Sequence, residues 1–318
     1  MKQALFEAQH EALWQRVATL LADKQPSNET QLPALYRQLC QSMALARQRG
    51  YSPLLTEHLH GLVLAMHRKL YGTPLERPMT LRRWLGVEFP RRVRQEWRLV
   101  LLVCLAFWGV AAAVGLLVWF QPHWAYSWMD WQELTRYEAM YSPSKEHIGR
   151  DGSDDDVMMF GFYIWNNVSI CFRTFAGGLF GGIPALFSLV FNGMHFGVIA
   201  AWLSRDPAVA EVFWSFVITH ASFEITGLLL SGVAGLRLGL TLIRPGRLSR
   251  RHALISASRH IFPVLVGAAL LTALAAFFEG FWSASSLIPP TTKFIVGGIC
   301  WALVIGFFVF AGRGQHEA

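Results

Sequence analysis

The chain has 318 residues, of which 53% are hydrophobic and only 15% are charged. A soluble domain of ordinary composition carries about 25% charged residues, so this composition argues against a wholly water-soluble protein. The net charge is +7, but most of the arginines gather beside long apolar segments. Such placement indicates membrane topology, so no nucleic-acid partner is expected.

Residues 1–75 read as an ordinary soluble sequence with three amphipathic helical segments, over about 3–22, 31–48 and 55–71. Pro and Gly clusters separate the segments, so a compact helical bundle is expected. The first residues lack the basic-then-apolar pattern of a secretory leader, so the first apolar span is expected to act as the targeting signal.

Residues 76–98 mix arginines with large apolar side chains and predict a basic amphipathic segment beside the membrane. A linker packed on the helical bundle explains the same pattern. The following run, 99–120, has no charged residue and is long enough to cross a hydrocarbon core of roughly 30 Å. Arginines before this span place the N-terminal domain in the cytoplasm.

The loop 121–159 is acidic and rich in Trp and Tyr, which is typical of a segment at the outer membrane surface. Apolar segments follow at about 160–204, 213–243, 261–282 and 294–311, and the first of these is long enough for two helices. The predicted fold is therefore all-α: a polytopic membrane domain over 99–313 with five or six embedded helices, behind an N-terminal cytoplasmic helical domain. Whether 160–176 crosses the membrane or re-enters it is left open.

Several polar residues lie inside the apolar segments, where a charged side chain costs about 2.5–3.5 kcal/mol at the centre of a helix. Such residues face protein or water, so we expect an intramembrane polar cluster. Its candidate members are Asn166, Asn167, Arg173, Asn192, His195, His220, Glu224, Arg237 and Glu279.

Small residues recur at intervals of four in the same segments, a spacing that lets helices approach closely in lipid. They form a stripe with His220 and Glu224 on one helix face, and this face is expected to pack against another helix or a second copy of the chain. The candidate packing glycines are Gly177, Gly181, Gly182, Gly193, Gly197, Gly235 and Gly239.

The pattern around His220 and Glu224 does not match a known catalytic signature. A zinc protease motif would need His-Glu-x-x-His and a further ligand. Glu279 is a conceivable third ligand, but no second His lies nearby in sequence, so neither a metal nor a cofactor is expected. A structural cluster that locks helices together, or lines a small aqueous cavity, is the favoured interpretation.

The ordered motifs resemble the family of integral membrane proteins similar to stage II sporulation protein M. The resemblance rests on Asn166-Asn167, the glycines of 177–182, Asn192-Gly193, His220 with Glu224, "SGVAGLRLG" at 231–239, and Glu279 in "AAFFEGFW". The chain departs from the family pattern at Ala221, in place of Gly, and at Ile225-Thr226, in place of Leu-Pro. The N-terminal motifs resemble the longer, non-sporulation branch.

The resemblance implies a non-enzymatic scaffold or assembly component of a cell-envelope complex in the bacterial inner membrane. It further implies a MoxR-type ATPase or von Willebrand-type envelope proteins as partners, and the glycine stripes favour a homodimer in the bilayer. The alternative is an ion or small-solute channel or transporter that uses the His, Glu and Arg residues. An intramembrane hydrolase is the third hypothesis.

Overall fold

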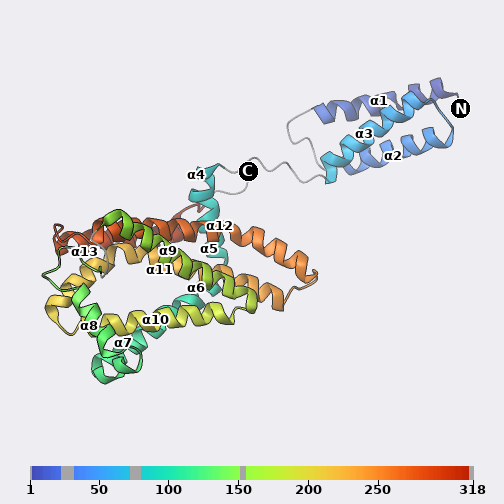
Figure 1. Cartoon of the computed structure of the whole chain (residues 1–318). Coiled ribbons are helices and arrows are strands. Elements are labelled where there is room, and N and C mark those ends of the chain that lie inside the picture. The colour runs from blue at the N-terminus through green and yellow to red at the C-terminus, as the bar shows by residue number, and fades with distance from the viewer. Residues whose placement is uncertain (1, 23–31, 72–79, 151–154, 315–318) are drawn as a thin grey trace. The chain divides into compact units, whose positions relative to one another are not determined.

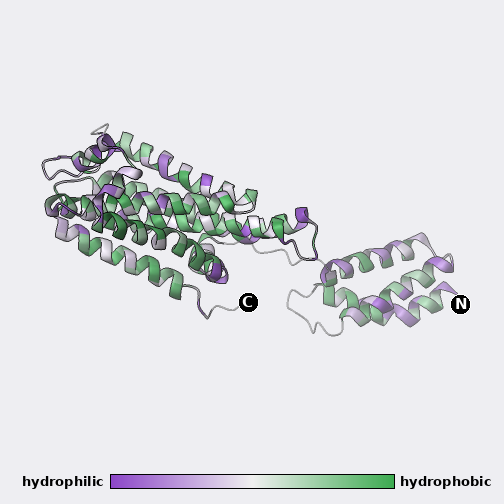
Figure 2. Ribbon diagram, turned by 90° about the horizontal axis from the view of Figure 1, so that it is seen from below, coloured by the Kyte–Doolittle hydropathy of each residue, from purple (hydrophilic) through white to green (hydrophobic). Residues whose placement is uncertain are grey.

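The computed structural model describes residues 2–22, 32–71, 80–150 and 155–314, and all regular structure in these ranges is helical (Figure 1). The chain divides into two compact units, residues 1–79 and 80–318. Figure 2 shows mixed hydrophilic and hydrophobic ribbon in the first unit and long hydrophobic helices in the second. This contrast follows the change of composition along the sequence.

The first unit is a bundle of three helices: α1 (Gln3–Ala22), α2 (Leu32–Gln48) and α3 (Pro53–Tyr71). Its core is a single apolar cluster to which all three helices contribute, with Phe6, Leu39 and Leu59 fully buried. Gln3 Nε2 donates a hydrogen bond to Ser52 Oγ at 3.0 Å, which ties the beginning of α1 to the beginning of α3. The apolar spacing of the sequence therefore builds a small soluble-type core.

The second unit begins with a short helical segment that packs against the long helices. Phe89 and Val93 are buried in the main apolar core, and the Phe89 ring lies edge-on to Phe308 near the end of the chain. The basic segment expected beside the membrane is thus continuous with the membrane unit. Its elements are α4 (Leu81–Arg83), the π-helical turn η2 (Trp84–Glu88) and α5 (Phe89–Gln95).

Within the described residues, five helical stretches are long and apolar enough to cross a membrane: Trp97–Phe120, Ile183–Leu203, Pro207–Ile243, Arg250–Ser283 and Pro290–Phe310. The first span consists of α6 (Trp97–Cys104), the π-helical turn η3 (Leu105–Gly109) and α7 (Val110–Phe120). The next two spans are α10 (Ile183–Leu203) and α11 (Pro207–Ile243). The fourth is α12 (Arg250–Phe277) with the π-helical turn η6 (Phe278–Ser283), and the fifth is α13 (Pro290–Phe310). The polytopic all-α fold predicted from the sequence is confirmed.

The segment whose path the sequence leaves open forms the helix α9 (Asp156–Gly177). Near its beginning, Phe160 lies against Gly280, and near its end, Phe175 lies against Gly235. Because Gly280 and Gly235 lie toward opposite ends of the bundle, α9 runs along α11 and α12, and it also packs against α10. Its 22 residues correspond to about 33 Å of helix.

The six long helices alternate in direction, so the bundle has two ends. At one end, Arg237 of α11 lies beside Glu96, and Val87 lies beside Gly312; we call it the basic end. At the opposite end, Arg205 donates to Trp119 O, and Ile148 N donates to Ala284 O. The opposite end also carries the short helices η4 (Pro122–Ser127) and α8 (Trp131–Met140).

The glycine pairs join helices of the same chain. A Cβ placed on Gly178 would lie 2.0 Å from Gly235 O, and one on Gly239 would lie 2.4 Å from Gly178 O. These contacts bring α11 against η5 (Gly178–Phe180), a short 3-10 turn between α9 and α10. Gly181 and Gly182 have φ values of +76° and +85°, which L side chains rarely adopt, so this tight turn requires glycine.

The other glycine pair of four-residue spacing joins α10 to the first span. A Cβ on Gly193 would lie 2.5 Å from Phe107 O, and one on Gly197 would lie 2.4 Å from Ala111 O. Gly177 similarly lies against Pro184 and Ala185 across the η5 turn. The close helix approach expected from the sequence is therefore used within one copy of the chain.

Candidate functional site

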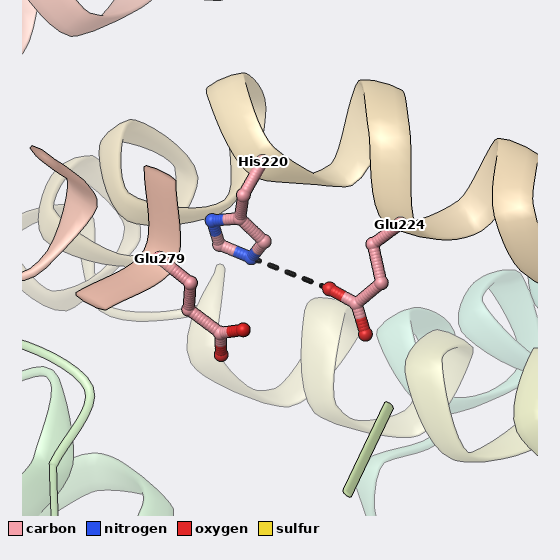
Figure 3. A group of neighbouring side chains, drawn as sticks. All are labelled: His220, Glu224 and Glu279. Atoms are coloured by element: carbon pink, nitrogen blue, oxygen red, sulfur yellow. Dashed lines mark ion pairs between the residues drawn. The ribbon is translucent and has the colours of Figure 1, made fainter. Parts of the chain in front are cut away.

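The polar residues at the opposite end converge on His220. His220 and Glu224 lie one turn apart on α11, and Glu279 reaches them from η6 (Figure 3). One ligand atom of each side chain lies within 4.8 Å of the other two. We call His220, Glu224 and Glu279 the His220 cluster. In Figure 3 both carboxylates lie on the side of the imidazole that carries Nε2.

The two ring nitrogens of His220 have different neighbours. Nδ1 lies 3.1 Å from Ser283 Oγ, and Nε2 lies 3.8 Å from Glu224 Oε2. His220 and Ser283 are buried, whereas the Glu224 side chain is 32% exposed. The fixed contact at Nδ1 orients Nε2 toward the two carboxylates.

Glu279 is positioned by a neighbouring helix. Asn167 Nδ2 of α9 donates to Glu279 Oε2 at 3.2 Å, and Asn166 Nδ2 donates to Asn167 Oδ1 at 2.9 Å. Glu279 and Ser283 are four residues apart in the π-helical turn, so both face α11. Single π-helical turns inside longer helices are frequent at functional sites.

A buried arginine, Arg150, links η6 to the beginning of α9 at this end of the bundle. Arg150 Nη2 donates to Asp156 Oδ1 at 2.5 Å and to Gly280 O at 2.7 Å, next to Glu279. Tyr141, at the end of α8, packs edge-on against Phe216, one turn before His220. Burial raises the pKa of Tyr141 well above its ordinary value, and the charge of Glu279 adds to this effect.

A second polar group lies at the basic end. Glu96 Oε1 accepts from Arg237 Nε at 3.1 Å and from His260 Nε2 at 3.2 Å, and Arg92 donates to the other ring nitrogen of His260. We call Arg92, Glu96, Arg237 and His260 the basic-end cluster. Glu96 is buried, so its two partners compensate most of the cost of removing a carboxylate from water.

The two clusters are separated by apolar packing. Between Glu224 and Arg237, α11 rises by about 20 Å. Most of its buried side chains over this distance belong to the main core, together with residues of α6, α9, α10 and α12. They include Ile225, Leu228, Leu229, Val233, Ala234 and Leu236. The buried polar side chains of this layer, Ser231, Thr272 and Thr174, carry no formal charge. Among the described residues, the two clusters thus lie at different depths with a mainly apolar layer between them.

The remaining candidates lie outside both clusters. Arg173 is exposed, and its Nε donates to Ser169 O of its own helix. Asn192 Nδ2 likewise donates to Ser188 O on α10. His195 Nε2 lies 3.2 Å from the Tyr137 hydroxyl of α8, where it ties α10 to the loop region.

Several residues at these two sites were not among the sequence candidates: Arg92, Glu96, Arg150, His260, Ser283 and Lys293. Lys293 is buried, and its Nζ donates to Ser283 O and Ser285 O at 2.8 Å each. Ser283 could have been predicted from the sequence, because it lies four residues after Glu279 and therefore on the same helix face. Glu96 was harder to predict from the sequence, and its one indication is that an acidic residue among arginines immediately before a span is unusual.

The geometry of the His220 cluster fits three kinds of chemistry. Its donor atoms could bind a cation, share a proton between carboxylates, or form a Ser283–His220–Glu224 relay. A relay needs a serine that contacts substrate. Ser283 is fully buried, so the relay is the weakest of the three. The two remaining chemistries use only the three clustered side chains.

The fold and this pattern of buried polar groups define a polytopic α-helical membrane protein. The sequence model of the family described as stage II sporulation protein M matches residues 99–284, which is more than half of the chain. The chain belongs to this family. Residues 4–72 match a second family, described as a domain of unknown function (DUF8413).

A curated relative is an uncharacterized protein of Methanocaldococcus jannaschii, 30% identical over 73 residues. The matched part covers 23% of this chain and 41% of that protein, so the chain spans about two-fifths of its length. No solved structure matches the chain.

Proposed function

We propose that this protein is a non-enzymatic scaffold of a cell-envelope complex in the bacterial inner membrane. The proposal rests on the separation of the two polar clusters by a buried, mainly apolar layer whose few polar side chains are neutral hydroxyls such as Ser231 and Thr272. A conducting path needs polar groups or water along its length, because an ion in an apolar interior has a very high free energy. Paired groups above and below an apolar core instead stabilise a closed bundle.

Several features agree with this role. The separate N-terminal unit offers a surface that the membrane bundle does not require for its own core. Arginine-rich segments at the basic end favour a cytoplasmic position for that end and for the N-terminal unit. Because the glycine pairs are used within the chain, a homodimer would form through the outward apolar faces of the span helices.

The proposed partners are a MoxR-type ATPase or a von Willebrand-type envelope protein that docks on the N-terminal unit. This unit exposes Leu54 (81%) and Leu5 (56%), which lie near the ends tied by the Gln3–Ser52 contact. Exposed apolar side chains of this size are candidates for a protein contact.

A direct test compares Leu54→Asp with Leu287→Asp in the full chain. Leu287 is 92% exposed in the second unit, so it provides a matched control. With the protein in nanodiscs, we expect Leu54→Asp to weaken binding of the MoxR-type ATPase by about tenfold or more, equivalent to about 1.4 kcal/mol. Leu287→Asp should bind as the wild type does. If neither partner class binds the wild-type chain, the proposed partnership is wrong.

A further inference from the structure

We infer that His220, Glu224 and Glu279 form a binding site for one divalent transition-metal ion, such as Zn²⁺ or Mn²⁺. The three side chains converge on one point. They come from two helical elements and place one ligand atom each within 4.8 Å of the others. Ligand atoms bound tetrahedrally to one zinc ion at about 2.0–2.2 Å lie roughly 3.4 Å apart, so the three atoms would have to move closer together. Small rotations of the two glutamates would complete such a site.

The hydrogen bonding around the two carboxylates also favours a cation. If His220 Nδ1 donates to Ser283 Oγ, then Nε2 presents a lone pair to Glu224 and Glu279, which are themselves acceptors. Asn167 Nδ2 donates a hydrogen bond to one oxygen of Glu279. Acceptors that face one another in a largely apolar surrounding require a positive charge between them, either protons or a cation.

Tyr163 and Arg150 lie near the cluster but leave its three ligand atoms free. Tyr163 lies one turn before Asn167 on α9, its side chain is buried, and its hydroxyl interacts with the Arg150 side chain. Arg150 also donates to Asp156 and to Gly280 O. The three ligand atoms of the cluster therefore belong to His220, Glu224 and Glu279 alone.

The ligand set selects the class of ion. One imidazole nitrogen and two carboxylate oxygens suit zinc, iron or manganese, whereas calcium and magnesium prefer oxygen alone. The contact of Ser283 with the second ring nitrogen resembles the outer contacts that orient metal-bound histidines. Two carboxylates also bring a formal charge of −2, which a divalent ion neutralises. The site would join α11 to η6 and hold the opposite end of the bundle closed.

The test measures metal in the purified full chain. After chelation and reloading with Zn²⁺ or Mn²⁺, we expect about one ion per chain by elemental analysis. Co²⁺ loading should give an absorption spectrum typical of protein nitrogen and oxygen ligands. Glu224→Gln, Glu279→Gln and His220→Ala should each lose the bound ion. Glu211→Gln, on the exposed part of α11, should retain it.

Ser283→Ala is the positioning variant, and it should retain the ion with about 10-fold to 100-fold lower affinity. Gel filtration and circular dichroism show whether each ligand variant folds. If one does not, the metal affinity of Ser283→Ala tests the proposal in its place. Failure of the wild-type chain to bind any of these ions would overturn the proposal. Binding that survives in folded Glu224→Gln and Glu279→Gln would also overturn it, because it would identify an adventitious ion only.

Discussion

Gly178→Ala is expected to lower the free energy of unfolding of the membrane unit by at least about 3 kcal/mol. The added Cβ would lie 2.0 Å from Gly235 O and 2.3 Å from Gly235 Cα. These atoms belong to the backbone of α11, so no side-chain rotation can remove the overlap. The helix would have to move away from η5, and the contact between Gly239 and Gly178 would be lost with it.

Gly161→Ala provides the matched control. Gly161 lies on α9, and a Cβ there would meet nothing within 4 Å. Because Ala favours a helix over Gly by about 1 kcal/mol, this change should leave stability equal or slightly higher. Unfolding in mixed detergent, followed by circular dichroism, measures both variants. Equal stability of Gly178→Ala and the wild type would contradict the close approach of α11 to η5.

Arg150→Met is expected to lower the free energy of unfolding by about 2 kcal/mol, because a buried carbonyl would lose its donor. The Arg150 side chain is 2% exposed and connects Asp156 at the beginning of α9 with Gly280 O of η6. Its loss would remove both of these contacts. Met retains most of the apolar volume, so the change reports mainly on the polar contacts.

Arg244→Met serves as the control for Arg150→Met, since Arg244 is exposed at the end of α11. It should change stability by less than about 0.5 kcal/mol. The same unfolding measurement applies to both variants. The rate of protease cleavage near residue 150 measures, in addition, how firmly that segment is held. Similar behaviour of the two variants would show that Arg150 does not hold the loop.

Hydropathy alone was sufficient for the spans that are uniformly apolar. The run 99–120 is an example, because every residue in it favours lipid over water. For α9 the same reasoning was indecisive: Asn166, Asn167 and Arg173 lower its hydropathy, and the glycines of 177–182 are compatible with either a turn or a re-entrant loop. Contacts with other helices, such as Phe175 against Gly235, stabilise α9 over its full length. The periodicity of the α9 sequence does not reveal these contacts.

The candidate site was predictable in part for a similar reason. His220 and Glu224 are four residues apart, so helical geometry alone places them together. Arg237 lies further along α11, at a different depth, and pairs with Glu96 instead of joining the His220 cluster. The rise of 1.5 Å per residue already separates it from Glu224 by about 20 Å. The approach of Glu279 depends on the packing of α12 against α11, which single-sequence patterns do not specify.

The central claim is that the membrane unit is a closed bundle, and ion flux through it tests that claim most directly. With the purified chain reconstituted in liposomes, proton and K⁺ flux should equal that of protein-free liposomes across neutral and mildly acidic pH. The separation of the His220 cluster from the basic-end cluster by apolar side chains is the physical reason. Flux that appears with the wild type and vanishes in a well-folded Glu224→Gln variant would contradict the scaffold and establish a transport path.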